Sequence, residues 1–129
     1  MSDGALVREL PDGGQEFVLE DPALSRLALD GRVHLRFGST DVTVSAPFEL
    51  DVDGVHHRLD PLRADTLTPL LATYPGTARW LWSPADGSLH LEFMQGQRLV
   101  VPGHPAAPAW SVGSVTAHGS RPVGRVAGR

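Results

Sequence analysis

The 129-residue chain contains no cysteine, and this absence excludes disulfides, thiolate zinc sites and cysteine nucleophiles. Isoleucine, lysine and asparagine are absent as well, so all 11 Lys-or-Arg positions are arginines. The codons of these three residues are AT-rich, and their joint absence indicates a GC-rich coding sequence. An arginine in this chain therefore does not by its type alone indicate a site selected for bidentate recognition.

Long apolar runs are also missing, since no segment approaches the roughly 20 residues that a membrane-spanning helix needs. The first residues include Asp3, Glu9 and Asp12 and no apolar stretch, which is not the pattern of a secretory signal. We therefore expect a cytoplasmic protein that does not bind membranes. The mild net charge of −4 at pH 7 argues against a dedicated nucleic-acid-binding role.

A short sequence unit occurs twice. Residues 30–37 and 86–93 share the pattern Asp-Gly-x-(apolar)-His-Leu-x-Phe at an offset of 56, and an apolar pair follows each copy at an offset of 57. Each copy alternates apolar and polar residues with period 2, which is typical of a β-hairpin with one buried face. The repeat predicts two similar hairpins about an approximate two-fold axis, with Phe37 and Phe93 in equivalent core positions.

A further hairpin is predicted over residues 48–59, between the two copies. Asp53-Gly54 is a strong signal for a two-residue turn, because glycine accepts a positive φ there. The turn sets the register and places Glu49 opposite Arg58 as a cross-strand ion pair. The other expected pairs are Val52 with Val55, Leu50 with His57, and Phe48 with Leu59.

Residues 62–74 form the one good helix candidate. Asp65 or Thr68 is the expected N-cap, Pro69 falls in the first turn, and Pro75-Gly76 ends the helix. The apolar face expected at helical spacing consists of Leu67, Leu70, Leu71 and Tyr74. Together these segments predict an α+β fold, with a mainly antiparallel sheet of about six strands built from β-hairpins and one short helix packed on one face.

The organisation of the chain is predicted from where glycine, proline and charge accumulate. Residues 1–14 read as a flexible leader, residues 15–113 as a single α+β domain, and residues 114–129 as a disordered basic tail. The cations of the tail are Arg121, Arg125 and Arg129, without any acidic residue.

Histidines are the first candidates for a ligand site. His34 and His90 occupy equivalent polar positions in the two repeat strands. If those strands are neighbours, the two imidazoles can approach each other and hold a metal, with His56 as a third ligand. The alternative is that both lie on the solvated face of a half-buried sheet. Because no metal-binding spacing or nucleophile motif is present, we predict no catalytic residue, cofactor or metal site.

Trp80 and Trp82 lie on one face of a strand predicted over residues 77–82, with Arg79 and Leu81 on the other. Because tryptophan is buried on average, the preferred interpretation is that the pair covers the core beneath the helix at residues 62–74. An exposed pair would instead anchor a partner. The candidate interaction surface is therefore Trp80, Trp82, His34 and His90.

Residues 87–110 combine Gly87, Leu89, Leu91 and Phe93 with Gly96, Leu99, Val101, Pro102 and a closing Ala109-Trp110. This arrangement resembles a small family of actinobacterial domains of unknown function, over about residues 27–112. Relatives of such domains can resemble immunity proteins of secreted-toxin systems, so the resemblance implies recognition of a protein partner and carries over no catalytic residue.

The function predicted from the sequence is a non-enzymatic binding module, immunity-like in its protein recognition. The alternative is a domain that binds a small ligand or metal through His34 and His90, and an enzyme is the less favoured class. The sequence predicts neither the identity of the partner nor the oligomeric state.

Overall fold

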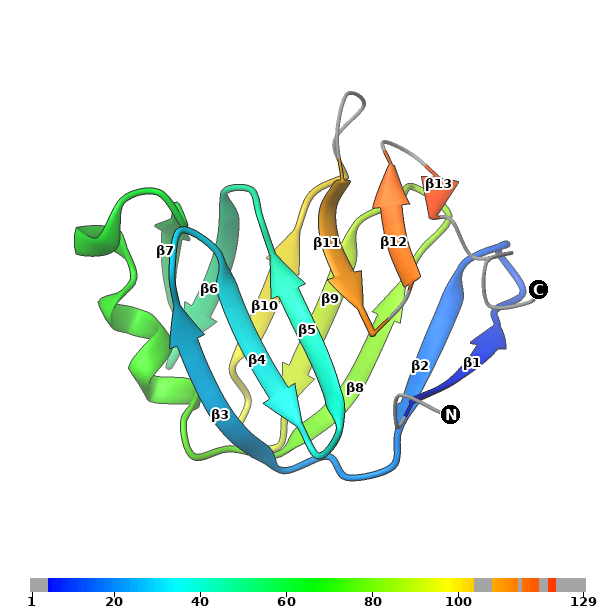
Figure 1. Ribbon diagram of the computed structural model, residues 1–129, viewed down its shortest axis with the longest axis horizontal. Coiled ribbons are helices and arrows are strands. Elements are labelled where there is room, and N and C mark those ends of the chain that lie inside the picture. Colours follow the sequence, from blue (N-terminus) through cyan, green and yellow to red (C-terminus); the bar gives the residue numbers. More distant parts are fainter. Residues whose placement is uncertain (1–4, 104–107, 114, 119–120, 123–129) are drawn as a thin grey trace.

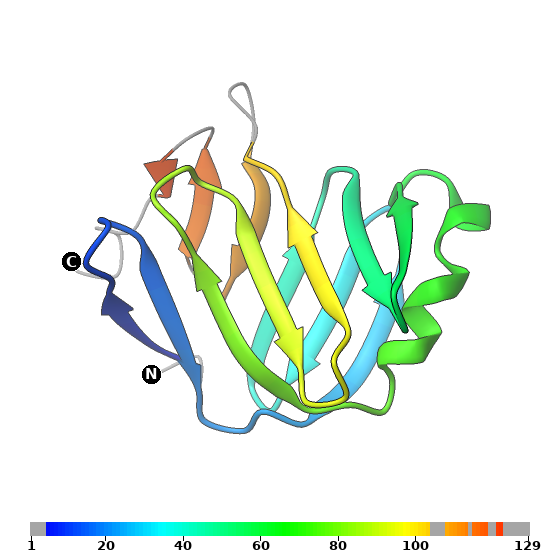
Figure 2. The same ribbon diagram turned by 180° about the vertical axis from the view of Figure 1, so that it is seen from behind.

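The computed structural model describes residues 5–103, 108–113, 115–118 and 121–122. Its strands form two antiparallel sheets that pack face to face as a β-sandwich (Figures 1 and 2). The seven-stranded sheet has the order β1 (Ala5–Glu9), β2 (Gln15–Leu19), β8 (Ala78–Ser83), β9 (Leu89–Phe93), β10 (Arg98–Val101), β6 (Phe48–Val52) and β7 (Val55–Leu59). The six-stranded sheet has the order β13 (Arg121–Pro122), β12 (Val115–His118), β11 (Pro108–Val112), β5 (Thr40–Val44), β4 (Val33–Phe37) and β3 (Leu24–Leu29).

The two repeat copies form one hairpin in each sheet. Residues of the first copy build β4 and β5, while the second copy builds β9 and β10. Phe37 and Phe93 project from opposite sheets into the same core, and their ring centroids lie 6.5 Å apart. The predicted hairpins and the equivalence of the two phenylalanines are therefore confirmed. The single sheet of about six strands is wrong, because the apolar faces of the two hairpins cover each other across a sandwich.

The hairpin between the two copies has the register set by its turn. Asp53 and Gly54 have φ angles of 51° and 80°, and β6 pairs with β7 at all four predicted positions. The ion pair expected between Glu49 and Arg58 is absent from the described residues, although the two face each other. Glu49 Oε1 instead lies 3.4 Å from His56 Nε2, a diagonal contact across the same pair of strands.

The predicted helix is replaced by two 3₁₀ segments, η1 (Ala64–Thr66) and η2 (Thr68–Thr73). The 3₁₀ turn repeats every three residues, so Leu67, Leu70 and Thr73 share the buried face. Leu71 and Tyr74, which the α-helical spacing placed on that face, are 63% and 45% exposed. Neither segment has a side-chain cap, so the prediction of Asp65 or Thr68 as N-cap is wrong. Figures 1 and 2 show both segments at the end of the sandwich beside β7 and β3.

The segments outside the predicted 15–113 domain are partly structured. Residues 5–9 of the expected leader form β1, which pairs with β2 along its whole length. In the expected basic tail, residues 115–118 and 121–122 form β12 and β13. Residues 1–4 of the predicted leader and residues 114, 119–120 and 123–129 of the predicted tail, which include Arg125 and Arg129, lie outside the described residues.

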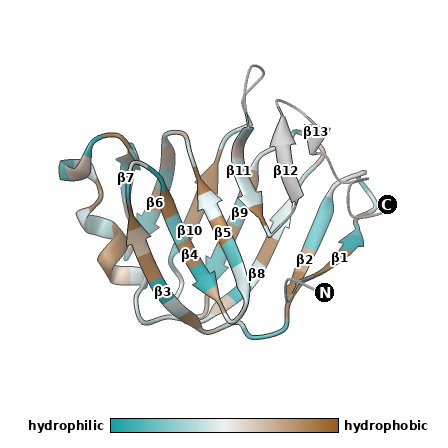
Figure 3. Cartoon of the chain, viewed as in Figure 1, coloured by the Kyte–Doolittle hydropathy of each residue, from teal (hydrophilic) through white to brown (hydrophobic). Residues whose placement is uncertain are grey.

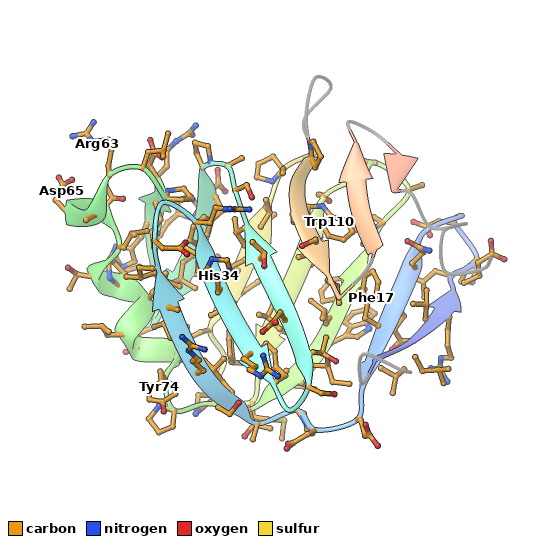
Figure 4. All side chains as sticks on the ribbon, viewed as in Figure 1. Phe17, His34, Arg63, Asp65, Tyr74 and Trp110 are labelled. Atoms are coloured by element: carbon orange, nitrogen blue, oxygen red, sulfur yellow. The ribbon has the colours of Figure 1, made fainter. Side chains whose placement is uncertain are left out.

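One apolar core joins the two sheets. Hydropathy alternates along the strands, as the banding in Figure 3 shows, so each sheet turns one apolar face inward. Trp110 on β11 is 1% exposed and donates a hydrogen bond from Nε1 to the backbone carbonyl of Gly87, at 2.9 Å. Its ring also meets Phe17 of β2 edge-on at 6.0 Å, so Trp110 contacts the opposite sheet at two points (Figure 4).

Candidate functional site: an aromatic strip on the seven-stranded sheet

The outer face of the seven-stranded sheet carries a stack of three rings, here called the aromatic strip: Trp80, Trp82 and His90. The two tryptophans are two residues apart on β8, and their ring centroids lie 3.7 Å apart with planes inclined by 19°. His90 on β9 is the cross-strand partner of Trp82 and stacks on it at 4.9 Å. Trp80 is 39% exposed at the open end of the stack. The strip therefore faces outward, not toward the core.

The preferred sequence interpretation of the tryptophans, that they cover the core beneath a helix, is wrong. Leu81 between them is buried, and strand alternation turns both rings to the outside. The 3₁₀ segments lie beside β7, at the far edge of the sheet from β1, and β9, β10 and β6 separate β7 from β8. The prediction that Arg79 and Leu81 share a face of the strand is also wrong, because Leu81 is buried and Arg79 is exposed. A shift of register between Ala78 and Trp80 leaves Arg79 exposed as the extra residue of a bulge.

Two ion pairs border the strip. Glu16 on β2 is the partner of Trp82 and accepts a 2.9 Å hydrogen bond from Arg8. Glu92 on β9 is the partner of Trp80 and accepts a 2.7 Å bond from Arg98. Each carboxylate beside the rings is thus already neutralised by an arginine on the next strand. The result is an apolar centre with a polar rim, which is the usual anatomy of a protein-binding surface.

A groove of about 240 Å³ opens between β2 and β8, next to Trp80. The two strands pair only at Gln15–Ser83 and Glu16–Trp82, and they diverge beyond those positions. The far end of the groove is closed by a 2.8 Å bond from the Ala78 amide to the Pro22 carbonyl. Its lining surface is about equally polar and apolar and comes from these residues: Glu16, Phe17, Val18, Leu19, Pro22, Ala78, Arg79, Trp80 and Leu81.

The inner end of the strip is fixed by a chain of hydrogen bonds from Asp86 through Ser88 to His90. Ser88 Oγ lies 2.6 Å from Asp86 Oδ1 and 3.1 Å from His90 Nε2. The serine has one hydroxyl proton, and the short distance assigns it to the carboxylate, so His90 donates from Nε2 to Ser88 Oγ. Ser88 is consequently no activated nucleophile, because its proton is held by Asp86 instead of being taken by the imidazole.

The protonation of this chain is shifted by its surroundings. Burial lowers the pKa of His90 below its ordinary value, partly opposed by the charge of Asp86, and the charge of Arg98 lowers it further. Hydrogen bonds from the Ser88 hydroxyl and amide lower the pKa of Asp86. At neutral pH the ring that stacks on Trp82 is therefore a neutral imidazole.

His34 lies apart from the strip. Its flanking residues Val33 and Leu35 point into the core from β4, so the imidazole lies on the outer face of the six-stranded sheet (Figure 4). There Nε2 contacts Asp30 Oδ1 at 2.8 Å and Nδ1 contacts Thr43 Oγ1 at 3.3 Å. By the same alternation His90 lies on the opposite outer face of the sandwich. Of the four residues in the predicted interaction surface, Trp80, Trp82 and His90 thus lie together, and His34 lies apart from them.

This separation overturns the alternative of a metal or ligand site built on His34 and His90, because the core of the sandwich lies between them. The third proposed ligand, His56, is on β7 and contacts Asp51 Oδ1 at 2.7 Å. Within the part of the chain that the structure describes, no three side chains of the metal-binding types converge. Among the same residues, no helical segment is long and apolar enough to cross a bilayer.

The sequence reasoning identified both tryptophans but missed what surrounds them. The bordering ion pairs Arg8–Glu16 and Arg98–Glu92 lie beside the rings only because of the strand order. That order places β2 and then β1 on one side of β8, and β9 and then β10 on its other side. The recurring Glu-Phe pair at residues 16–17 and 92–93 was the available signal, since it predicts an outward carboxylate beside an inward ring.

Comparison with known proteins identifies a family. Residues 16–127 match the sequence model of a Family of unknown function (DUF6188), and the chain belongs to that family. The predicted membership of a family of unknown function is thereby confirmed, over a wider span than the resemblance indicated. No curated protein and no solved structure matches the chain significantly.

Proposed function

We propose that this member of a family of unknown function is a non-enzymatic binding module that recognises a protein partner through the aromatic strip. The observation that carries the proposal is the outward position of Trp80, which is 39% exposed at the end of a stacked and therefore rigid row of rings. Tryptophan is enriched at the centres of protein interfaces, and a ring already ordered before binding loses little conformational entropy.

The shape of the strip favours a protein over a flat ligand. Trp80 and Trp82 stack face to face at 3.7 Å, so they present ring edges and one free face instead of a flat platform. The adjoining groove of about 240 Å³ has the size of one large side chain, and it offers apolar and polar surface in similar amounts. A partner that inserts such a side chain next to Trp80 buries apolar surface while the bordering ion pairs stay at the rim.

A narrower proposal is that the module is immunity-like and acts within an actinobacterial toxin system. Its support is the resemblance of residues 87–110 described above. An enzyme is less favoured, because the Asp86–Ser88–His90 chain has the serine at its centre, with the hydroxyl proton bonded to Asp86.

The test is capture of partners by the full-length chain, with Trp80→Ala compared against a matched surface variant. Leu71→Ala is the control, because Leu71 is 63% exposed on η2 at the end of the sandwich. We expect a protein that wild type and Leu71→Ala retain from extracts of the source organism, and that Trp80→Ala loses. Circular dichroism verifies that both variants fold.

Two results would overturn the proposal. One is a partner retained equally by Trp80→Ala and wild type, which would move the interface elsewhere. The other is wild type that captures no protein from extracts across growth conditions. Purified partner then allows hydrogen exchange on the complex, where protection is expected in β2 and β8.

A further inference from the structure

The outer face of the six-stranded sheet places two arginines directly opposite each other. Arg26 on β3 and Arg36 on β4 are register partners in an antiparallel pair. Like charges in this arrangement destabilise a sheet, because their side chains are neighbours on one face. Since every Lys-or-Arg position of the chain is arginine, it is the placement of the two residues, not their type, that is informative.

The two arginines differ in their partners. Arg36 is held in place by a 3.0 Å bond from Nε to the Gly38 carbonyl and by longer contacts from Nη1 to Asp41, at 3.3 and 3.4 Å. Arg26 is exposed, and within the described residues no hydrogen bond or ion pair engages its guanidinium. One guanidinium is thus fixed while the facing one is free to close on a ligand.

A hollow of about 230 Å³ lies at this pair. It exists because Ala28, two positions after Arg26, places a small side chain opposite His34. Its lining residues come from β3, β4, β5 and the β3–β4 turn: Arg26, Ala28, Asp30, His34, Arg36 and Asp41.

Each of the two carboxylates of the hollow already has a partner within it, Asp30 with His34 and Asp41 with Arg36. Asp30 Oδ1 is bonded to His34 at 2.8 Å, four residues along the chain from Arg26. Asp41 is the partner of Arg36 on its other side, so Arg36 stands between Asp41 and Arg26 in the sheet. Two strand spacings amount to about 9.6 Å, and four residues along a strand to about 13 Å. Among the residues that the structure describes, neither carboxylate forms an ion pair with Arg26.

We infer that this hollow binds an oxyanion, either a phosphate group or a carboxylate, between the guanidinium groups of Arg26 and Arg36. Guanidinium groups donate paired hydrogen bonds to both anions, and a bound anion relieves the repulsion between the two arginines. The site is independent of the aromatic strip, because it lies on the opposite face of the sandwich.

The experiment is a titration of the full-length chain with inorganic phosphate and, in a second arm, with succinate, at constant ionic strength. Nuclear magnetic resonance follows the Nε–Hε signals of Arg26 and Arg36, and a thermal melt follows stability. We expect one anion to shift these signals saturably and to raise Tm. Saturation by phosphate alone assigns the site to phosphate, and saturation by succinate alone assigns it to carboxylates.

Two variants remove the same charge in different places. Arg26→Gln is expected to weaken anion binding about tenfold or more, since it removes charge-assisted hydrogen bonds, and to raise Tm in the absence of anion by removing the repulsion. Arg58→Gln, on the exposed β7 of the other sheet, should bind as wild type does. Shifts that never saturate in either arm, or equal weakening in both variants, would overturn the inference.

Discussion

Phe37 and Phe93, which occupy the same position in the two sequence repeats, face each other across the core with ring centroids 6.5 Å apart and planes inclined by 39°. Each lies at the end of a strand whose alternate residues are buried, β4 in one sheet and β9 in the other. The repeat thus supplies both halves of the contact that joins the sheets. The pair is the structural consequence of the duplicated hairpin.

Truncation of either ring should therefore destabilise the fold strongly. Phe37→Ala and Phe93→Ala are each expected to lower the free energy of unfolding by about 3–5 kcal/mol, because both rings are 1% exposed and each truncation leaves a cavity. The double variant should cost less than the sum, since the first truncation already removes the mutual contact. Urea denaturation measures the free energy of unfolding of the two single variants and the double variant. Strict additivity would show that the rings contribute independently.

The turn of the β6–β7 hairpin gives a second, local prediction. Gly54 has a φ of 80°, so Gly54→Ala should cost about 1–2 kcal/mol by forcing a side chain into the left-handed region. Asp53 also has a positive φ, but asparagine tolerates it, so Asp53→Asn should be nearly neutral. Chemical denaturation of the two variants compares them. Equal stability of Gly54→Ala and wild type would contradict the turn geometry.

Local signals explain what was predictable in the fold. The Asp53-Gly54 turn and the period-2 alternation around it determine the β6–β7 register from adjacent residues alone. Strand order is different, because β2 pairs with β8 and β10 pairs with β6 through contacts that no local pattern encodes. The 3₁₀ geometry of residues 64–73 was also missed, since leucines at spacings of three and four are compatible with an α-helix until the buried face is known.

The aromatic strip was predictable to the same extent as the fold, since local patterns indicated its residues but not their long-range packing. Alternation alone places Trp80 and Trp82 on one face, but which face is outside depends on the packing of the second sheet. The repeat made His34 and His90 equivalent, and that equivalence suggested that they meet. In a sandwich with one copy in each sheet, the same equivalence places them on opposite outer faces. Arg26 and Arg36 became a candidate only through the β3–β4 register.

Trp110 gives a prediction for the link between the sheets. Trp110→Phe removes the donor that bonds the buried Gly87 carbonyl at 2.9 Å, and an unsatisfied buried carbonyl costs about 1–3 kcal/mol. Trp80→Phe is the matched control, because it keeps a ring on Trp82 at an exposed position and should change stability by less than about 0.5 kcal/mol. Denaturation followed by far-ultraviolet circular dichroism compares the two. Equal losses would contradict the tethering role of Trp110.

His90 should make stability depend on pH. Its pKa in the folded protein is lowered below 6.5, chiefly by burial, so the unfolded chain binds more protons between the two values. Stability therefore falls as the pH drops below about 6.5 and levels off once the pH is below the folded pKa. His90→Gln should flatten this decline, whereas His34→Gln should keep it. The lowered pKa of Asp86 acts in a separate, more acidic range, where stability is lost as the carboxylate is protonated. Denaturation midpoints measured from pH 8 to pH 4.5 test this assignment, and an unchanged slope in His90→Gln would refute it.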